Sequence, residues 1–266
     1  MGTVMIALFA LVVALDAAPV EPPVAAVAPA PAPVRDAKFV LADYARAIGD
    51  ESAWKKHRSV RLKREVAVKA MHFTSYEETT VARGGKIFST SEMPGMGRFR
   101  RGCDGRVAWS EDPIGGLRVL KGAEAEDMRV AAVWNSEWRL GAVYAKVASV
   151  PPPVPAPSGE IWECVELTKN KGQPSTLCFD SKTHLRVWEK GVQASQGGEV
   201  PYVTRFSDWR VVDGAKVWYQ EDVTIGPVFM EGHIVEIVFD EPVPATLFTL
   251  PKKVPHKKVK ARHKSK

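Results

Sequence analysis

Three cysteines are the residues with the clearest potential chemistry in this sequence. Cys164 and Cys178 flank the turn-like segment TKNKGQPST, so two antiparallel strands joined there would place them opposite each other. A disulfide between them would stabilise the fold by roughly 3 kcal/mol in the chain-entropy model, and an exported protein would allow it. A register shift of one residue would put the thiols on opposite faces, so the sequence leaves both arrangements open. Cys103 remains, and we expect an unreactive thiol.

Patterns typical of enzymes are missing from the sequence. It contains no G-x-S-x-G, no H-E-x-x-H, no P-loop and no G-x-G-x-x-G. The six histidines are scattered singly, and His256 and His263 lie close to the C-terminus. Neighbouring carboxylates such as Glu77 and Glu78 point to opposite faces of a strand and cannot share a substrate. We therefore predict a protein that is not an enzyme and that uses no metal and no cofactor.

A tight hairpin is predicted in the segment GCDGRVAWSEDP, residues 102–113. Asp104 and Gly105 form the pair that a type I′ turn favours, because both central residues of that turn need positive φ. The turn joins two antiparallel strands, and the second strand carries Trp109. The sequence does not say which face of the sheet Trp109 occupies.

Alternating hydrophobicity of period two dominates the chain after the first sixty residues. In residues 59–68, Val60, Leu62, Val66 and Val68 share one face, which Arg64 interrupts. Short strand-like segments joined by turn residues continue to residue 239 and predict one antiparallel sheet of about eleven strands. A sheet of that size curls, and its concave face must be covered.

Helices are predicted at the start of the domain and in one insertion. Asp36 is a plausible N-cap for a first helix that Gly49 ends, and a short helix follows within residues 51–57. Residues 122–140 have a helical pattern, and the Pro-rich loop at 150–159 closes the insertion. These helices are the only candidates to cover the sheet, so the predicted class is mainly β, of the α+β kind.

Both ends of the chain differ from this domain, which we place at 36–250. Residues 4–15 are an unbroken apolar run, so 1–18 is predicted to be a signal peptide or an uncleaved signal anchor. Residues 19–35 are rich in Pro and Ala, as in an extended linker. Export to the periplasm is therefore expected, with a tether to the inner membrane if the signal is not cleaved.

The basic character of the chain belongs to its tail at 251–266. That segment holds eight of the Lys and Arg residues and no acidic residue, and without it the net charge of +6 becomes −2. A nucleic-acid-binding domain would carry its positive charge on the folded face, so no specific nucleic acid is predicted. The tail is either a solvated extension or a weak ligand of anionic membrane surfaces.

Four motifs in the same order resemble the outer-membrane lipoprotein-sorting proteins, the LolA/LolB superfamily. They are the opening LADYARAIGDESAWKKHRSVRL, the hairpin GCDGRVAW, the strand pair TLCFDSKTHLRVW, and FSDWRVVDGAKVWYQ with the closing segment PVPATLFTLP. The resemblance covers about 36–251. Asp50 stands where that family usually has a second glycine.

The resemblance implies an unclosed β-barrel whose helices plug a hydrophobic chamber for acyl chains. The implied function is a periplasmic binding or carrier protein with lipid or lipoprotein acyl chains as partners. A monomer is expected. A membrane-tethered envelope sensor or scaffold, which binds a protein segment in the same groove, is the alternative. The residues expected in or beside the chamber are Leu62, Arg64, Val66, Phe88, Phe99, Trp109, Leu117, Trp134, Trp138, Trp188 and Phe206.

Two of these residues have alternative interpretations. Trp109 either borders the chamber or packs in the core. Arg64 either holds the lid helix, as an inward arginine does in LolA relatives, or is turned outward by a bulge or placed in an ion pair at the rim.

Overall fold

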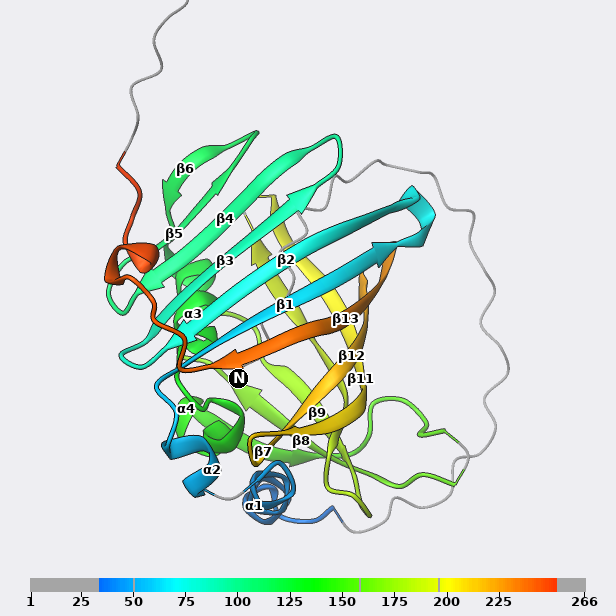
Figure 1. The fold of residues 1–266 in the computed structure, drawn as a ribbon. Coiled ribbons are helices and arrows are strands. Elements are labelled where there is room, and N and C mark those ends of the chain that lie inside the picture. Colours follow the sequence, from blue (N-terminus) through cyan, green and yellow to red (C-terminus); the bar gives the residue numbers. More distant parts are fainter. Residues whose placement is uncertain (1–33, 50, 158, 196, 253–266) are drawn as a thin grey trace, which may run out of the picture.

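The computed structural model describes residues 34–252 except 50, 158 and 196. The predicted signal segment, nearly all of the Pro/Ala-rich linker and the basic tail beyond 252 lie outside the described residues. Figure 1 shows a strongly curved sheet with helices inside its curve and at one end.

One antiparallel sheet of thirteen strands forms the domain, with β1 paired to β13 and two meanders extending from that pair. The end strands β6 and β7 do not pair with each other, so the barrel is unclosed, as predicted. The short strand β7, which follows the insertion, was not among the predicted strands. The strands are β1 (Ser59–Val68), β2 (Phe73–Ala82), β3 (Lys86–Met93), β4 (Gly97–Asp104), β5 (Ala108–Asp112), β6 (Gly116–Val119), β7 (Lys146–Val150), β8 (Trp162–Thr168), β9 (Ser175–Asp180), β10 (Arg186–Ser195), β11 (Gly198–Val212), β12 (Ala215–Ile225) and β13 (Val228–Phe239).

Strand register places an apolar row across the inner face of the sheet. Val60, Val81, Ile87, Cys103 and Ala108 are directly opposite one another on five successive strands, β1 to β5. All five belong to the main hydrophobic core. Burial raises the pKa of the Cys103 thiol, which keeps it protonated and unreactive.

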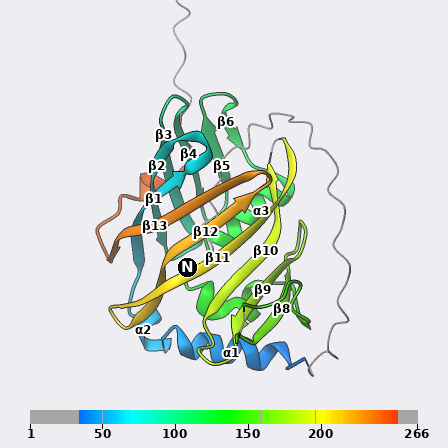
Figure 2. The same ribbon diagram turned by 90° about the vertical axis from the view of Figure 1, so that its right-hand side faces the viewer.

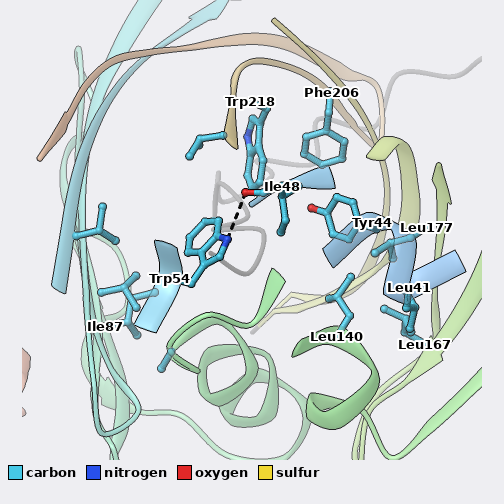
Figure 3. Close-up of a cluster of buried hydrophobic side chains, with 14 of the residues drawn as sticks. Leu41, Tyr44, Ile48, Trp54, Ile87, Leu140, Leu167, Leu177, Phe206 and Trp218 are labelled. Atoms are coloured by element: carbon cyan, nitrogen blue, oxygen red, sulfur yellow. Dashed lines mark hydrogen bonds between the residues drawn. The ribbon is translucent and has the colours of Figure 1, made fainter. Parts of the chain in front are cut away.

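Helix α1 (Ala37–Ala47) closes one end of the core, against β7 and β8. Its N-cap is Asp36, whose side chain accepts a hydrogen bond from the Lys38 amide, as the sequence predicts. The short helix α2 (Glu51–Lys55) follows, and its Trp54 indole donates to the Ile48 carbonyl over 3.3 Å. Figure 3 shows Trp54 and Ile48 among the buried side chains that fill this end.

The insertion between β6 and β7 is not one helix. It forms α3 (Gly122–Ala131), the 3₁₀ turn η2 (Glu137–Arg139) and the short α4 (Leu140–Val143). The predicted helix over 122–140 is broken at Asn135, which has a left-handed φ of 60° that a right-handed helix cannot contain. A further 3₁₀ turn, η3 (Ala245–Phe248), lies against β3 and β4 near the C-terminal end.

The insertion covers the concave side. Helix α3 contacts β4 and β5 on one side and β10 on the other, so it crosses the gap that the unclosed sheet leaves. Figures 1 and 2 show the strands curving around it. Within the described part of the chain, no helix combines the length and the apolar character that crossing a bilayer would need.

The structure joins Cys164 and Cys178, which are directly opposite each other on β8 and β9. Reduction of this disulfide should lower the free energy of unfolding by about 3 kcal/mol, because it releases a closed loop in the unfolded chain. Urea unfolding with and without reductant measures the loss. Thiol alkylation of denatured protein recovered from an oxidising compartment should label only Cys103 before reduction; labelling of all three cysteines would contradict the bond.

Candidate functional site: a cavity under helix α3

A cavity of about 160 Å³ lies between α3 and the inner face of the sheet. Its apolar lining includes Ile87, Phe99, Leu120, Leu140 and Leu177. The volume is close to the roughly 150 Å³ that holds a benzene molecule in an engineered protein core. The cavity therefore accepts a small group or one end of a chain, and a longer guest requires α3 to move.

Charged side chains hold α3 over this cavity from two sides. On the β6 side, the Arg118 guanidinium donates to both carboxylate oxygens of Glu124, each over 2.7 Å. On the other side, Lys169 donates to Asp127, just beyond the end of β8. These pairs are partly exposed, so each contributes little stability, but together they fix where the helix sits.

A buried ion cluster centred on Arg64 lies in the sheet wall. Arg64 is 3% exposed and donates to Glu77, directly opposite on β2, over 2.6 Å, and to Glu221 on β12. The Trp218 indole donates to the same Glu221 over 3.3 Å. Burial raises the pKa of Glu221, and the charge of Arg64 opposes that rise.

This cluster corrects the prediction that Arg64 is turned outward or placed in an ion pair at the rim. A register shift between Lys63 and Arg64 forms the expected bulge, but the side chain points inward and its ion pairs are buried. Both carboxylates belong to the sheet, Glu77 to β2 and Glu221 to β12. Through these two carboxylates Arg64 ties the three strands β1, β2 and β12 together.

A second buried ion cluster surrounds Arg186, which the sequence analysis did not single out. Its guanidinium lies 3.2 Å from Glu137 of η2 and 3.2 Å from Glu189 of β10. It also lies over the rings of Phe206, at 4.0 Å, and Trp218, at 4.8 Å. Burial lowers the pKa of Arg186, but the charge of Glu137 and other neighbours outweighs burial and raises it above its usual value.

Two tyrosines complete this second cluster. Tyr44 of α1 donates to Glu137 over 2.5 Å, and Tyr202 of β11 donates to Glu189 over 2.6 Å. Burial, together with the charge of the adjacent carboxylate, raises the pKa of both phenols well above the usual value. Both therefore stay protonated as donors. The cluster connects α1, the insertion and the sheet behind the cavity.

Comparisons with known proteins identify the architecture. No family model and no curated protein matches this sequence. A LolA superfamily protein from Nitrosomonas europaea superposes with a TM-score of 0.53 at 11% identity, covering 81% of this chain and 98% of its own. An outer membrane lipoprotein-sorting protein domain from Vibrio parahaemolyticus gives 0.52 at 12%, covering 78% and 94%. A DUF1329 family protein from Desulfovibrio piger gives 0.53 at 13%, covering 80% and 97%.

This chain has the LolA fold. At such low identity the likeness establishes the architecture and not the function.

Five of the residues predicted for the chamber face the interior of the LolA-type sheet. Phe99 lines the cavity. Leu62 and Phe206 pack in the main core, and Arg64 forms the first ion cluster. Val66 packs in a separate cluster with Tyr202 and Val223.

The other predicted residues do not line the cavity. Trp134 and Trp138 belong to the insertion and pack against the main core. Trp188 packs with Trp162 and the Cys164–Cys178 disulfide on the outer face. The remaining three, on the β3–β6 part of the sheet, are Phe88, Trp109 and Leu117. Each lies next in sequence to an inward residue of the cavity lining or core, so its own side chain points to the opposite face of the sheet.

Trp109 is buried on the outer face of the sheet. Its indole donates to the carbonyl of Phe248 in η3 over 3.0 Å, and its ring lies 6.1 Å from that of Phe88. A Cβ added to Gly102 would lie 2.7 Å from the Trp109 ring, so the neighbouring strand needs a glycine there. The tryptophan thus attaches the C-terminal segment to the sheet. Among the described residues, no group of three or more His, Cys, Asp or Glu side chains is placed to hold a metal ion.

Replacing Arg64 by methionine should lower the free energy of unfolding by about 3–5 kcal/mol, because Glu77 and Glu221 would lose their buried counter-charge. Lys63→Met, on the exposed side of the same strand, should cost less than about 1 kcal/mol. Urea unfolding of both variants measures the difference. Equal small losses would show that the cluster is unimportant for folding.

Replacing Trp109 by alanine should lower the free energy of unfolding by about 3–5 kcal/mol. Uptake of a fluorescent lipid by the folded protein should stay unchanged, because the ring lies outside the cavity. Phe99→Ala is the matched variant on the cavity side and should weaken uptake. A Trp109 variant that loses uptake while its melting temperature is retained would contradict this placement.

Proposed function

We propose that this protein is an exported, non-enzymatic binding or carrier protein that holds an acyl chain of a lipid or lipoprotein under α3. The observation that carries the proposal is the cavity between a LolA-type sheet and a covering helix. The Vibrio parahaemolyticus neighbour, described as a lipoprotein-sorting domain, supports the same class of cargo.

Burial of methylene groups supplies the affinity in this proposal. Each methylene contributes roughly 0.8 kcal/mol when it leaves water. The apolar side chains of Ile87, Phe99 and Leu120 offer such surface, and Met128 of α3 faces them across the cavity. A chain longer than the cavity enters as α3 moves away from the sheet, which breaks partly exposed charge pairs and the apolar contacts of Ala125 and Met128 with the core.

The predicted location of the protein is the periplasm, and the tail at 251–266 adds attraction to anionic membrane surfaces. This tail and the signal segment lie outside the described residues, so their roles rest on sequence alone. A monomer is the expected form.

Native mass spectrometry of the purified full chain tests the proposal directly. Bound lipid should appear as a mass increment that organic extraction removes. Protein that carries no lipid and takes up none from vesicles would contradict it. If such lipid-free protein also fractionates with the inner membrane, the tethered sensor or scaffold becomes the better interpretation.

Replacing Ala131 by tryptophan should reduce lipid binding at least about tenfold, because the larger side chain fills the cavity that Ala131 lines. Arg129→Trp is the matched control, since Arg129 lies on the exposed side of α3. Both variants are compared by native mass spectrometry and by thermal unfolding. Equal binding by the two variants would show that lipid does not enter this cavity.

A further inference from the structure

A polar row crosses the inner face of the sheet beside the apolar row of the core. Thr79, Ser89, Arg101, Ser110 and Arg118 are directly opposite one another on β2 to β6. Four of them, all except Thr79, line the cavity. One end of any bound molecule therefore meets hydrogen-bonding groups, whereas the other end meets Ile87, Leu120 and similar side chains.

Most inward hydroxyl groups near this row already have partners. The hydroxyls of Thr79 and Ser89 lie 2.7 Å apart, and those of Ser75 and Ser91 lie 3.0 Å apart. The hydroxyls of Ser110 and Ser136 differ, because each is buried without a hydrogen-bond partner among the described protein groups. Ser110 is 7% exposed and Ser136 is 1% exposed, and both line the cavity.

The two serines approach the cavity from different walls. Ser110 belongs to β5 of the sheet, whereas Ser136 belongs to the insertion, just before η2. A buried hydroxyl without a partner costs free energy, so a bound group that bonds to both would be favoured over one that bonds to neither. A head with several oxygen atoms meets this condition, and a bare hydrocarbon does not.

The charges of the lining do not favour an anionic head. Five cationic and six carboxylate side chains line the cavity, so it holds no excess of positive charge. The carboxylates each contact a cation, in the pairs Glu77–Arg64, Glu111–Arg100, Glu124–Arg118, Asp127–Lys169, Glu137–Arg186 and Glu189–Arg186. Burial lowers the pKa of Arg101 to about 10, so this guanidinium is still charged at neutral pH and donates hydrogen bonds.

We propose that the cavity recognises an uncharged, oxygen-rich head group of the acylglycerol class, with Ser110 and Ser136 bonding its hydroxyls and Arg101 donating to its ester oxygen. This inference rests on the proposed function, which supplies the acyl chain, and adds the chemistry of the polar end. The head lies along the polar row, and the first methylenes of the chain lie against Ile87 and Leu120.

Three ligands with the same ten-carbon chain test the inference by titration calorimetry of the purified full chain. Monodecanoylglycerol carries an ester and two hydroxyls, methyl decanoate carries the ester alone, and decanoate carries a negative charge. We expect monodecanoylglycerol to bind about tenfold more tightly than methyl decanoate, and decanoate to bind most weakly.

The double variant Ser110→Ala/Ser136→Ala should remove most of the advantage of monodecanoylglycerol over methyl decanoate. Its affinity for methyl decanoate should change by less than about twofold, which also shows that the variant is folded. Ser207→Ala, on an exposed position of β11, is the matched control and should retain the full advantage. Arg101→Gln should weaken both esters alike.

The outcomes separate this inference from the proposed function. Tightest binding of decanoate, or an advantage that survives in the double variant, would overturn the head-group assignment while acyl binding stands. Equal binding of all three ligands would do the same. Failure of all three to bind would overturn both proposals.

Discussion

The unclosed sheet imposes the main physical constraint on this protein. Thirteen twisted strands curl into most of a barrel, but β6 and β7 do not pair with each other, so the concave face needs a cover. The chain must cross this opening to pass from β6 to β7, and the insertion at the crossing supplies α3 and α4. The same connection therefore covers the core and forms one wall of the cavity. A binding function placed here depends on how firmly that connection is held.

Buried charge distinguishes this interior from a simple hydrophobic chamber. Arg64 and Arg186 each contact two buried carboxylates. Removing such groups from water is costly, and the interior retains them because each charge has an opposite partner and further hydrogen bonds. The lining of the cavity consequently combines apolar side chains with charged and hydroxyl-bearing ones. An amphiphile matches this lining better than a hydrocarbon does.

Much of the fold could be predicted from local sequence. The alternation around Val60 and Leu62, the Asp104–Gly105 turn and the cap at Asp36 each have a local physical cause, and together they indicate an antiparallel sheet preceded by a helix. The pairing of Cys164 with Cys178 was one of two arrangements that the turn between them allowed. The break at Asn135 was not predicted, because helical periodicity continues through that position. The strand β7 was not predicted either, because so few residues define it.

The sequence by itself determined which residues share a face, and only the tertiary structure decided which face is inside. Period two assigns Trp109 and Ala108 to opposite sides of β5, but only the position of η3 buries the tryptophan on the outer side. Likewise, the sequence marked Arg64 as an interruption, whereas its partners come from strands 13 and 157 residues away along the chain. Long-range register brings those carboxylates to it, and no local pattern encodes that register.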